Sequence, residues 1–322
     1  MKKLLGLIGM IGLTFLLGAC GANDNTSNTT ETSQSANGNE PVTLILGVMP
    51  ATDNIPLIIA HEKGFDVKHG VKLDLQTFRS AQERDAAFAA GAIDGLSTDL
   101  VGVAISRNSG SDLMITSTTF GTFNLITGND SVQTVADLKG KDVIVSKNTG
   151  AEYAIAMMLK DAGLSMDDIN ILEVAAVPAR LEALKNGQAA AAILPEPFAT
   201  MAQAEGLRML SSTEKIGINP FVMAFPKATI EQKAVAIRGM YEAYNEAVAY
   251  IQSHDKADFI QFFIDDVGFP ETLKDQIQVP AYTKATQASD ADIQSAFTWA
   301  KSAGLLEKEL TPQDVLSDVF FR

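Results

Sequence analysis

Short apolar runs rich in β-branched residues alternate with stretches of helical periodicity along most of the chain. The first run, Val42 to Val48, is followed by a polar turn and by a helical stretch that ends at Gly64. Further strands are expected at 71–76, 93–96 and 113–118. Because strands that alternate with helices usually lie side by side in one direction, this pattern predicts an α/β protein with mostly parallel sheets.

The pattern is repeated in a second unit. Asp142 to Ser146 predicts a strand, and Thr149 followed three residues later by Glu152 forms a capping-box sequence at the start of a helix. The segment from Arg84 to Gly91 has the same spacing as the segment from Arg180 to Gly187, and a short apolar strand follows each. Two similar units predict two lobes with a cleft between them. The alternative is that any two strand–helix–strand units look alike.

The chain is expected to cross twice between these lobes. Polar and glycine residues interrupt the pattern at Thr119 to Phe123, and Gly217 to Pro220 marks the return. We therefore expect residues 42–120 and 221–322 to form one lobe and residues 121–220 to form the other.

Within this arrangement, a segment beginning at Asn124 is expected to form an edge strand of the second sheet. Phe221 to Phe225 is expected to re-enter the first sheet, and Pro226 to stop it. The remainder is expected to be helical, with a long amphipathic helix capped by Thr229 and Gln232 and reaching about Ser253. Shorter helices are expected at 257–266, 271–277, 291–303 and 312–320.

The amino terminus predicts export and lipidation. Two lysines precede an apolar run from Leu4 to Leu17, and the run ends in Leu17-Gly18-Ala19-Cys20 with the only cysteine of the chain. That run is short of the ~20 residues that a membrane-spanning helix needs. Residues 1–20 are therefore interpreted as a lipoprotein signal peptide. Residues 21–41 are rich in Asn, Thr, Ser and Gly, and they are expected to form a disordered tether.

The net charge and the motifs that the sequence lacks argue against several classes of function. The net charge of -14, with 39 acidic and 25 basic residues, argues against a nucleic-acid or anionic-membrane surface. The sequence has no phosphate-binding loop, no Gly-x-Ser-x-Gly elbow and no His-Glu-x-x-His helix. The three histidines, His61, His69 and His254, lack metal-ligand spacing. We therefore expect neither catalysis nor a metal nor a cofactor.

Polar residues gather where the predicted strands end, and ligands of open α/β sheets bind beyond the carboxyl ends of their strands. The candidate ligand-binding residues are Asp53, Asn54, Ser97, Thr98, Asp99, Thr118, Thr119, Asn148, Thr149 and Glu196. For each of them the alternative is a helix cap. Arg84 and Arg180 lie in the middle of predicted helices behind these loops, and structural surface roles are expected for them.

The acidic candidates bear on the solute. Asp53, Asp99 and Glu196 would repel an anion unless they point away or are already satisfied as caps, so they favour an amine, an amidine-like ring or another donor-rich solute. Four aromatic residues are candidates for contact with a flat ring: Phe120, Tyr153, Phe198 and Phe221.

Several motifs, in this order, resemble those of the solute-binding lipoproteins of ABC importers. They are the lipobox at Cys20, Ile58 to Gly64, Ala90 to Asp94, Asp137 to Lys141, Pro195 to Phe198, and a tail segment from Trp299 to Leu306. The similarity is to the branch with the type II periplasmic-binding-protein fold. That branch includes sulfonate, taurine and nitrate binders and binders of thiamine-pyrimidine precursors.

The resemblance implies an extracytoplasmic monomer, tied to the lipid bilayer through lipidated Cys20. It would capture a small nitrogen- or sulfur-containing solute, either sulfonate-like or similar to a thiamine-pyrimidine precursor, by hinge closure. The closed form would then dock on an ABC permease powered by an ATPase. The alternatives are an enzyme on the same fold, of the pyrimidine-forming type, and a surface binder or sensor component without its own permease.

Overall fold

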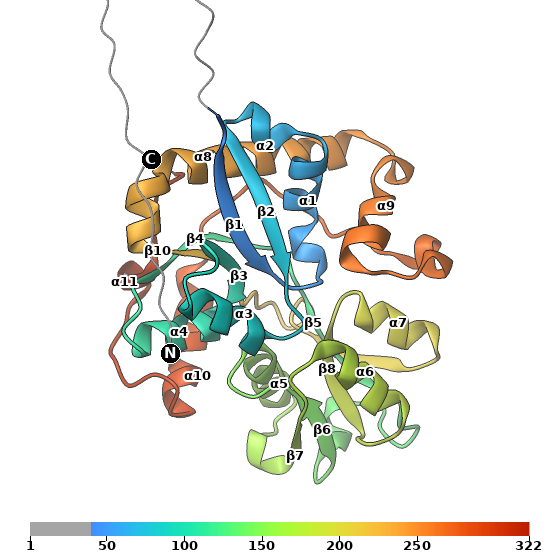
Figure 1. Ribbon diagram of the computed structural model, residues 1–322. Helices are drawn as coiled ribbons and strands as arrows, with labels where there is room; N and C mark the ends of the chain where they lie inside the picture. The colour runs from blue at the N-terminus through green and yellow to red at the C-terminus, as the bar shows by residue number, and fades with distance from the viewer. Residues whose placement is uncertain (1–39, 322) are drawn as a thin grey trace, which may run out of the picture. The chain divides into compact units, whose positions relative to one another are not determined.

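The computed structural model describes residues 40–321, which contain two five-stranded sheets with helices on both faces (Figure 1). Cys20 and nearly all of the expected tether lie outside the described residues. We call the part built on the first sheet the first lobe and the part built on the second sheet the second lobe.

The first sheet has the strand order β2-β1-β3-β10-β4. Its strands are β1 (Val42–Val48), β2 (Val71–Thr77), β3 (Gly95–Asp99), β4 (Leu113–Thr118) and β10 (Phe221–Pro226). Strand β1 pairs in parallel with β2 and β3, whereas β10 runs antiparallel between β3 and β4. The expected re-entry of Phe221 to Phe225 into this sheet is therefore confirmed.

The second sheet has the order β7-β6-β8-β5-β9. Its strands are β5 (Phe123–Thr127), β6 (Asp142–Val145), β7 (Asn170–Glu173), β8 (Ala191–Pro195) and β9 (Arg208–Ser212). The expectation of an edge strand near Asn124 is wrong, because β5 lies between β8 and β9 and pairs antiparallel with both. All five residues of β5 are buried, as a strand with a neighbour on each side requires. Each sheet thus has a single antiparallel strand.

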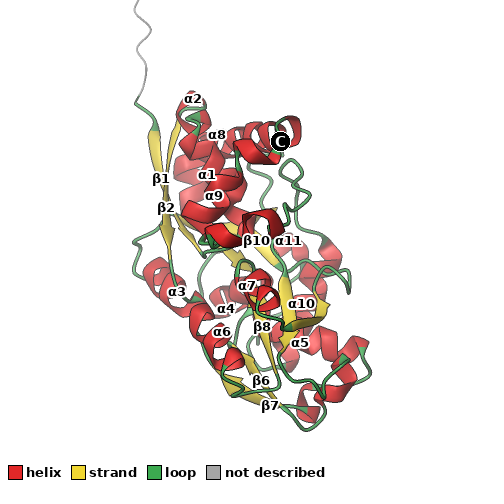
Figure 2. Ribbon diagram, turned by 90° about the vertical axis from the view of Figure 1, so that its right-hand side faces the viewer, coloured by secondary structure: helices red, strands yellow, loops and turns green. Residues whose placement is uncertain are grey.

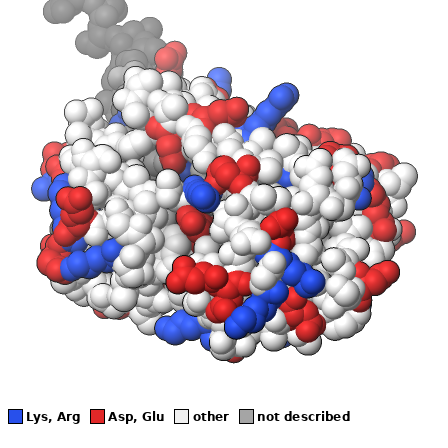
Figure 3. All heavy atoms as spheres, turned by 90° about the horizontal axis from the view of Figure 1, so that it is seen from below, with Lys and Arg blue, Asp and Glu red and all other residues white. Residues whose placement is uncertain are grey.

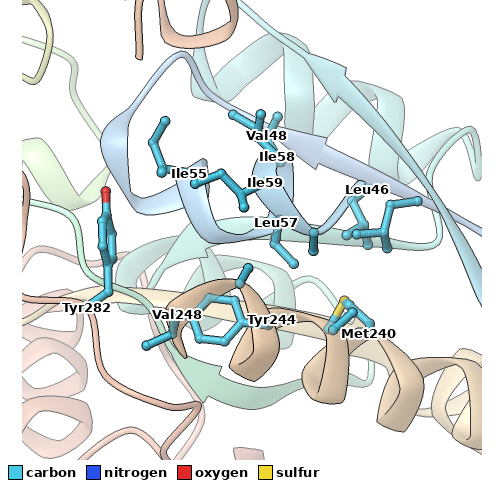
Figure 4. Packing of buried hydrophobic residues seen from close by; sticks show 14 of the residues in the cluster. Leu46, Val48, Ile55, Leu57, Ile58, Ile59, Met240, Tyr244, Val248 and Tyr282 are labelled. Carbon is cyan, nitrogen blue, oxygen red and sulfur yellow. The ribbon is translucent and has the colours of Figure 1, made fainter. Parts of the chain in front are cut away.

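In the first lobe, α1 (Ile55–Glu62) and the long α8 (Lys227–Ser253) cover one face of the sheet. Figure 4 shows Leu57 and Ile59 of α1 turned toward Met240 and Tyr244 of α8. The other face is covered by α3 (Ala81–Ala89), α4 (Leu100–Asn108) and α10 (Asp290–Ser302). Both faces of this sheet carry apolar side chains, and the helices on each face bury them.

The sheet of the second lobe is likewise covered by helices on both faces, as the alternating side chains of β6 show. Val143 and Val145 pack under α5 (Gly150–Asp161), whereas Ile144 packs under α6 (Val177–Lys185) and α7 (Phe198–Ala204). In Figure 2 the helices α5 and α6 lie on opposite sides of the strands.

The helical tail departs from expectation in three places. Helix α8 begins at Lys227 directly after Pro226, and not at Thr229; it is kinked at Lys233, whose backbone is non-helical (φ -116, ψ 23). The helix expected at 312–320 is only α11 (Pro312–Val315), because Leu316 turns to pair in parallel with Ile115 of β4.

The helix expected at 257–266 divides into α9 (Ile260–Phe262) and a π-helical turn at Phe263–Val267. The remaining helix of α type is α2 (Phe65–Lys68), and single 3₁₀ turns occur at Thr52–Asn54, Val135–Leu138, Met166–Asp168, Lys256–Asp258 and Glu271–Gln276.

In the described part of the chain, none of the helices combines the length and the apolar character needed to cross a membrane. On the face seen in Figure 3, lysine and arginine side chains lie among aspartates and glutamates and do not gather in one basic patch.

Candidate functional site between the lobes

The carboxyl ends of the strands of both sheets face a common cavity, which we call the interlobe cavity. Its walls are the loops after β1, β6 and β7, the carboxyl ends of β3 and β8, the first turns of α3 and α5, and one side of α6. Phe123 and Phe221, the first residues of β5 and β10, complete the lining. The cavity has a volume of about 70 Å³. One water molecule needs roughly 10–15 Å³ of such volume, so the cavity has room for about five or six heavy atoms of a small solute.

Five of the ten candidate residues line this cavity: Asp53, Ser97, Thr98, Asp99 and Thr149. Asp99 is the N-cap of α4, and its Oδ1 accepts hydrogen bonds from the amides of Val101 (3.0 Å) and Gly102 (2.9 Å). Burial raises the pKa of Asp99, while the positive charge of Arg84 opposes that rise. This carboxylate is therefore held mainly by the start of α4 in its own lobe.

Asp53 is similarly engaged. Its Oδ2 accepts hydrogen bonds from the hydroxyls of Ser97 (2.8 Å) and Thr119 (3.3 Å), and burial raises the pKa of Asp53. The two cavity carboxylates thus have donors from the protein already. Asp99 meets the expected condition for an acid that would not repel an anion, because it is satisfied as a helix cap. Asp53 caps no helix with its side chain, although its Oδ2 has two hydroxyl donors.

Arg84 does not have the expected surface role, because its side chain is only 3% exposed and it lines the cavity. Its Nη1 donates to the carbonyl of Ser97 and its Nη2 to Thr98 Oγ1, each at 2.9 Å, and the guanidinium pairs with Asp85. Arg84 is therefore a fully partnered group that braces the end of β3.

Arg180 was also expected at the surface, and it too is buried, at 4% exposure, on the opposite wall of the cavity. Its Nη1 donates to the carbonyl of Ile193 at 2.7 Å. Within residues 40–321 its Nε has no hydrogen-bond partner, and none of the ion pairs includes this side chain. Burial lowers the pKa of Arg180 to about 10, and the negative charge of Glu173 partly opposes that shift. The side chain is therefore a buried cation at neutral pH that forms no direct ion pair among the described residues.

The two arginines occupy equivalent positions, since each donates to a strand-end carbonyl 13 residues further along the chain. The equal spacing of Arg84–Gly91 and Arg180–Gly187 was the signal that could have located them. A mid-helix arginine is usually solvated, and that general rule led to the wrong expectation.

The lobes touch at the rim of the cavity. Gln82 Nε2 donates to Ser146 Oγ at 3.1 Å, and the amide of Gly150 forms a hydrogen bond with Asp99. A Cβ atom on Gly150 would lie 2.6 Å from Asp99 Cγ, so this close approach requires glycine. The capping box expected at this helix start is incomplete, because Glu152 accepts from the amide of Asn148 instead of that of Thr149.

The other five candidates lie elsewhere. Asn54 donates to the carbonyl of Met49, Thr118 ends β4 and donates to the carbonyl of Phe221, and Thr119 begins the first crossing and donates to Asp53. Asn148 is exposed, with a left-handed backbone (φ 58), and Glu196 faces a different cavity, where it accepts from the amide of Thr200 at 3.0 Å.

Of the four aromatic candidates, Phe221 lines the interlobe cavity and stacks on Phe123 with ring centroids 4.6 Å apart. Tyr153 packs against Trp299, and Phe198 packs in the second lobe. Phe120 lines the same cavity as Glu196. No group of three or more His, Cys, Asp or Glu residues within 40–321 is arranged to hold a metal ion.

Comparison with known proteins identifies relatives among binding proteins. The chain is 27% identical over 116 residues to a binding protein of Brucella abortus, a match that covers 36% of either chain, or about a third of that relative's length. An ABC transporter periplasmic binding protein of Brachyspira hyodysenteriae is 24% identical over 205 residues, which are 57% of this chain and 58% of that one.

Solved structures share the architecture. The alkanesulfonate-binding protein SsuA from Xanthomonas axonopodis pv. citri, bound to MOPS, gives a TM-score of 0.73 at 21% identity, over 87% of this chain and 99% of that chain. The periplasmic nitrate-binding protein NrtA from Synechocystis PCC 6803 gives 0.71 at 18% identity, over 88% of both chains. The desulfurization enzyme DszB gives 0.66 at 15% identity, over 86% of this chain and 96% of that chain.

These similarities confirm the expected two-lobed periplasmic-binding-protein fold. The model of the NMT1-like family matches residues 37–262, which is more than half of the chain. The fold and this match together establish that the chain belongs to the NMT1-like family.

Proposed function

We propose that the protein is the extracytoplasmic solute-binding component of an ABC import system and that it captures a small anionic solute in the interlobe cavity. The observation that carries this proposal is Arg180, a buried cation in the cavity wall whose Nε has no hydrogen-bond partner and which forms no direct ion pair among the described residues. Glu173 is the carboxylate whose charge acts on it. A buried unpaired charge is costly, and an anionic ligand would supply the missing partner.

The chemistry of the wall favours a sulfonate-like solute over an aminopyrimidine. Asp53 and Asp99 already accept hydrogen bonds from the protein, so they offer little to a cationic ring. A sulfonate or similar oxyanion can accept the hydrogen of Arg180 Nε in a charge-assisted bond. The volume of about 70 Å³ suits a compact head group such as methanesulfonate.

Capture would follow from closure of the lobes. The contacts of Gln82 with Ser146 and of Asp99 with Gly150 join the two lobes at the cavity rim, and they would break when the lobes separate. A solute that bridges the lobes shifts the equilibrium toward the closed form. An ABC permease and its ATPase would receive the closed form, and lipidated Cys20 would keep the protein at the membrane.

An enzyme on this fold is the rival function, since one solved structure with the same architecture is a desulfurization enzyme. None of the described residues that line the interlobe cavity is a cysteine or a histidine. Among these residues there is thus no histidine to activate the hydroxyls of Ser146 and Thr149, and the hydroxyl of Ser97 already donates to Asp53. Binding is therefore the function that these residues favour.

ATP-dependent uptake tests the proposal. Cells that carry the gene are expected to accumulate radiolabelled methanesulfonate, and cells with the gene deleted are expected to lose that uptake. Binding of the anion without any effect of the deletion on uptake would favour a surface binder or sensor component. Conversion of the solute by the purified protein would favour an enzyme.

A further inference from the structure

Helix α5 of the second lobe has two apolar sides. Ile155 and Leu159 pack on the sheet of their own lobe. Tyr153 and Met157, which are four residues apart and therefore share one side of the helix, pack in the apolar cluster that α4, α10 and the sheet of the first lobe form. In Figure 2, α5 and α10 lie side by side, although they belong to different lobes. This second apolar side is therefore buried only while the two lobes are in contact.

Tyr153 makes the most specific of these contacts, which we call the Tyr153 latch. The residue is only 1% exposed. Its ring meets the ring of Trp299 edge-on with centroids 5.7 Å apart, and its hydroxyl donates to Ser295 Oγ at 2.9 Å. Trp299 and Ser295 both belong to α10 of the first lobe. A buried tyrosine with a packed ring and a partnered hydroxyl joins two elements through a large apolar area and a hydrogen bond.

The Tyr153 latch lies on the same helix end as the contact at the cavity rim. The amide of Gly150 forms a hydrogen bond with Asp99, and Tyr153 follows three residues after Gly150 on α5. A movement of α5 that separates Gly150 from Asp99 would therefore also draw Tyr153 out of the first lobe. Neither Tyr153 nor Ser295 nor Trp299 is among the described residues that line the interlobe cavity. The latch thus acts on closure whether or not a solute is present.

We propose that Tyr153 is a positioning residue for solute capture, because its latch holds the solute-free protein predominantly in the closed form. The apparent affinity for a ligand scales with the fraction of the protein that is in the binding-competent form. Loss of the latch lowers that fraction and weakens solute binding, although no contact with the solute is removed. The proposal rests on the capture of a solute by closure, and it goes further by placing part of the free energy of closure outside the solute site.

The first test needs no solute. Small-angle X-ray scattering of the solute-free full-length chain compares the wild type with variants of two tyrosines. Tyr153→Ala removes the ring and the hydroxyl, and it is expected to raise the radius of gyration; Tyr153→Phe removes the hydroxyl alone, and a smaller rise is expected. Tyr250→Ala is the matched control and is expected to cause no change, because the ring of Tyr250 contacts Phe65, His254 and Lys63 of its own lobe.

Trp299 provides a second readout, because it is the only tryptophan of the chain and lies against Tyr153. Tyr153→Phe keeps the neighbouring ring, so a more exposed Trp299 in this variant reports separation of the lobes. Quenching of its fluorescence by acrylamide is expected to rise in the solute-free variant and to return to the wild-type level with saturating methanesulfonate. This measurement also keeps the test decisive if Tyr153→Ala does not fold.

Titration calorimetry completes the test. Tyr153→Ala is expected to weaken methanesulfonate binding about tenfold, as a fall of the closed fraction to about one tenth requires. Tyr153→Phe, which loses one hydrogen bond, is expected to weaken it about threefold. Saturating methanesulfonate is expected to contract the Tyr153→Ala variant and to leave the radius of gyration of the wild type nearly unchanged.

Two results would overturn the proposal. The first is that solute-free Tyr153→Ala and Tyr153→Phe give the same scattering and the same Trp299 quenching as the wild type. The second is that methanesulfonate contracts the wild type as much as it contracts Tyr153→Ala. A failure of the proposed function gives a different pattern: methanesulfonate then binds neither the wild type nor the variants, whereas expansion of solute-free Tyr153→Ala still supports the latch.

Discussion

Replacement of Arg180 by methionine tests whether this side chain binds the ligand or only stabilises the fold. The side chain is 4% exposed, and its pKa falls from 12.5 to about 10, which corresponds to about 3 kcal/mol of cost for keeping the charged form in the fold. Because the folded pKa is below the unfolded one, this cost is present at neutral pH and is relieved only as the pH rises above about 10.

Methionine has a similar length and no charge, so Arg180→Met removes that cost. It also leaves the carbonyl of Ile193 without its donor, which costs about 1–3 kcal/mol. The two terms nearly offset each other. The free energy of unfolding of the ligand-free protein is therefore expected to stay unchanged or to rise by up to about 2 kcal/mol.

Affinity is expected to respond in the opposite direction. The variant cannot supply a charge-assisted bond to an oxyanion, so binding of methanesulfonate is expected to weaken by about 100-fold, or about 2.7 kcal/mol. Urea unfolding followed by circular dichroism gives the stability, and titration calorimetry gives the affinity.

Arg84→Met is the matched control in the other lobe. Arg84 donates to Ser97 and Thr98, pairs with Asp85, and places its charge near Asp53 and Asp99. Its loss leaves buried carboxylates without their compensating charge, and about 3 kcal/mol of stability is expected to be lost. If Arg180→Met destabilises the protein as much as Arg84→Met does, and methanesulfonate affinity is retained, Arg180 is structural and the reasoning is refuted.

Three further predictions concern closure, pH and anchoring. Gly150→Ala places a methyl group 2.6 Å from Asp99 Cγ, so it is expected to hold the lobes apart. The affinity for methanesulfonate is expected to fall about tenfold or more, and the radius of gyration of the solute-bound protein in X-ray scattering is expected to rise. Unchanged affinity would contradict this prediction. Burial raises the pKa of Asp53, so its ionisation in the fold costs stability as the pH rises above the ordinary value of 3.8. The stability of Asp53→Asn relative to the wild type is therefore expected to increase with pH above about 4 in urea unfolding, and a constant difference would refute the assignment. Cys20→Ala is expected to move the protein from the membrane fraction to the soluble fraction, and persistent anchoring would refute the lipidation prediction, which lies outside the described residues.

The parts of the fold that the sequence predicted are those with strong local patterns. β1, β4 and the re-entering β10 are apolar runs bounded by polar turns. Ser97, Thr98 and Asp99 of β3 and Thr149 after β6 line the interlobe cavity, whereas Asn148 does not. The place of β5 could not be read locally, because it depends on β9, which pairs with it from more than 80 residues further along the chain.

The arginines show the same limit. Arg84 and Arg180 are recognisable as cavity residues only once the carbonyl 13 residues away is known to lie at the same strand end. Their charge in turn reverses the sequence-based preference for a cationic solute in the interlobe cavity, because Asp53 and Asp99, two of the acids on which that preference depended, already accept hydrogen bonds from the protein. Glu196, the third of these acids, faces a different cavity, beside residues 276–281 and the two crossings.

The most direct test of the account is a crystal structure of the protein grown with methanesulfonate. We predict electron density for the sulfonate in the interlobe cavity, with an oxygen within hydrogen-bonding distance of Arg180 Nε and with the two lobes in contact at Gly150. An interlobe cavity that holds only water at saturating methanesulfonate, or an anion bound away from Arg180, would contradict the account.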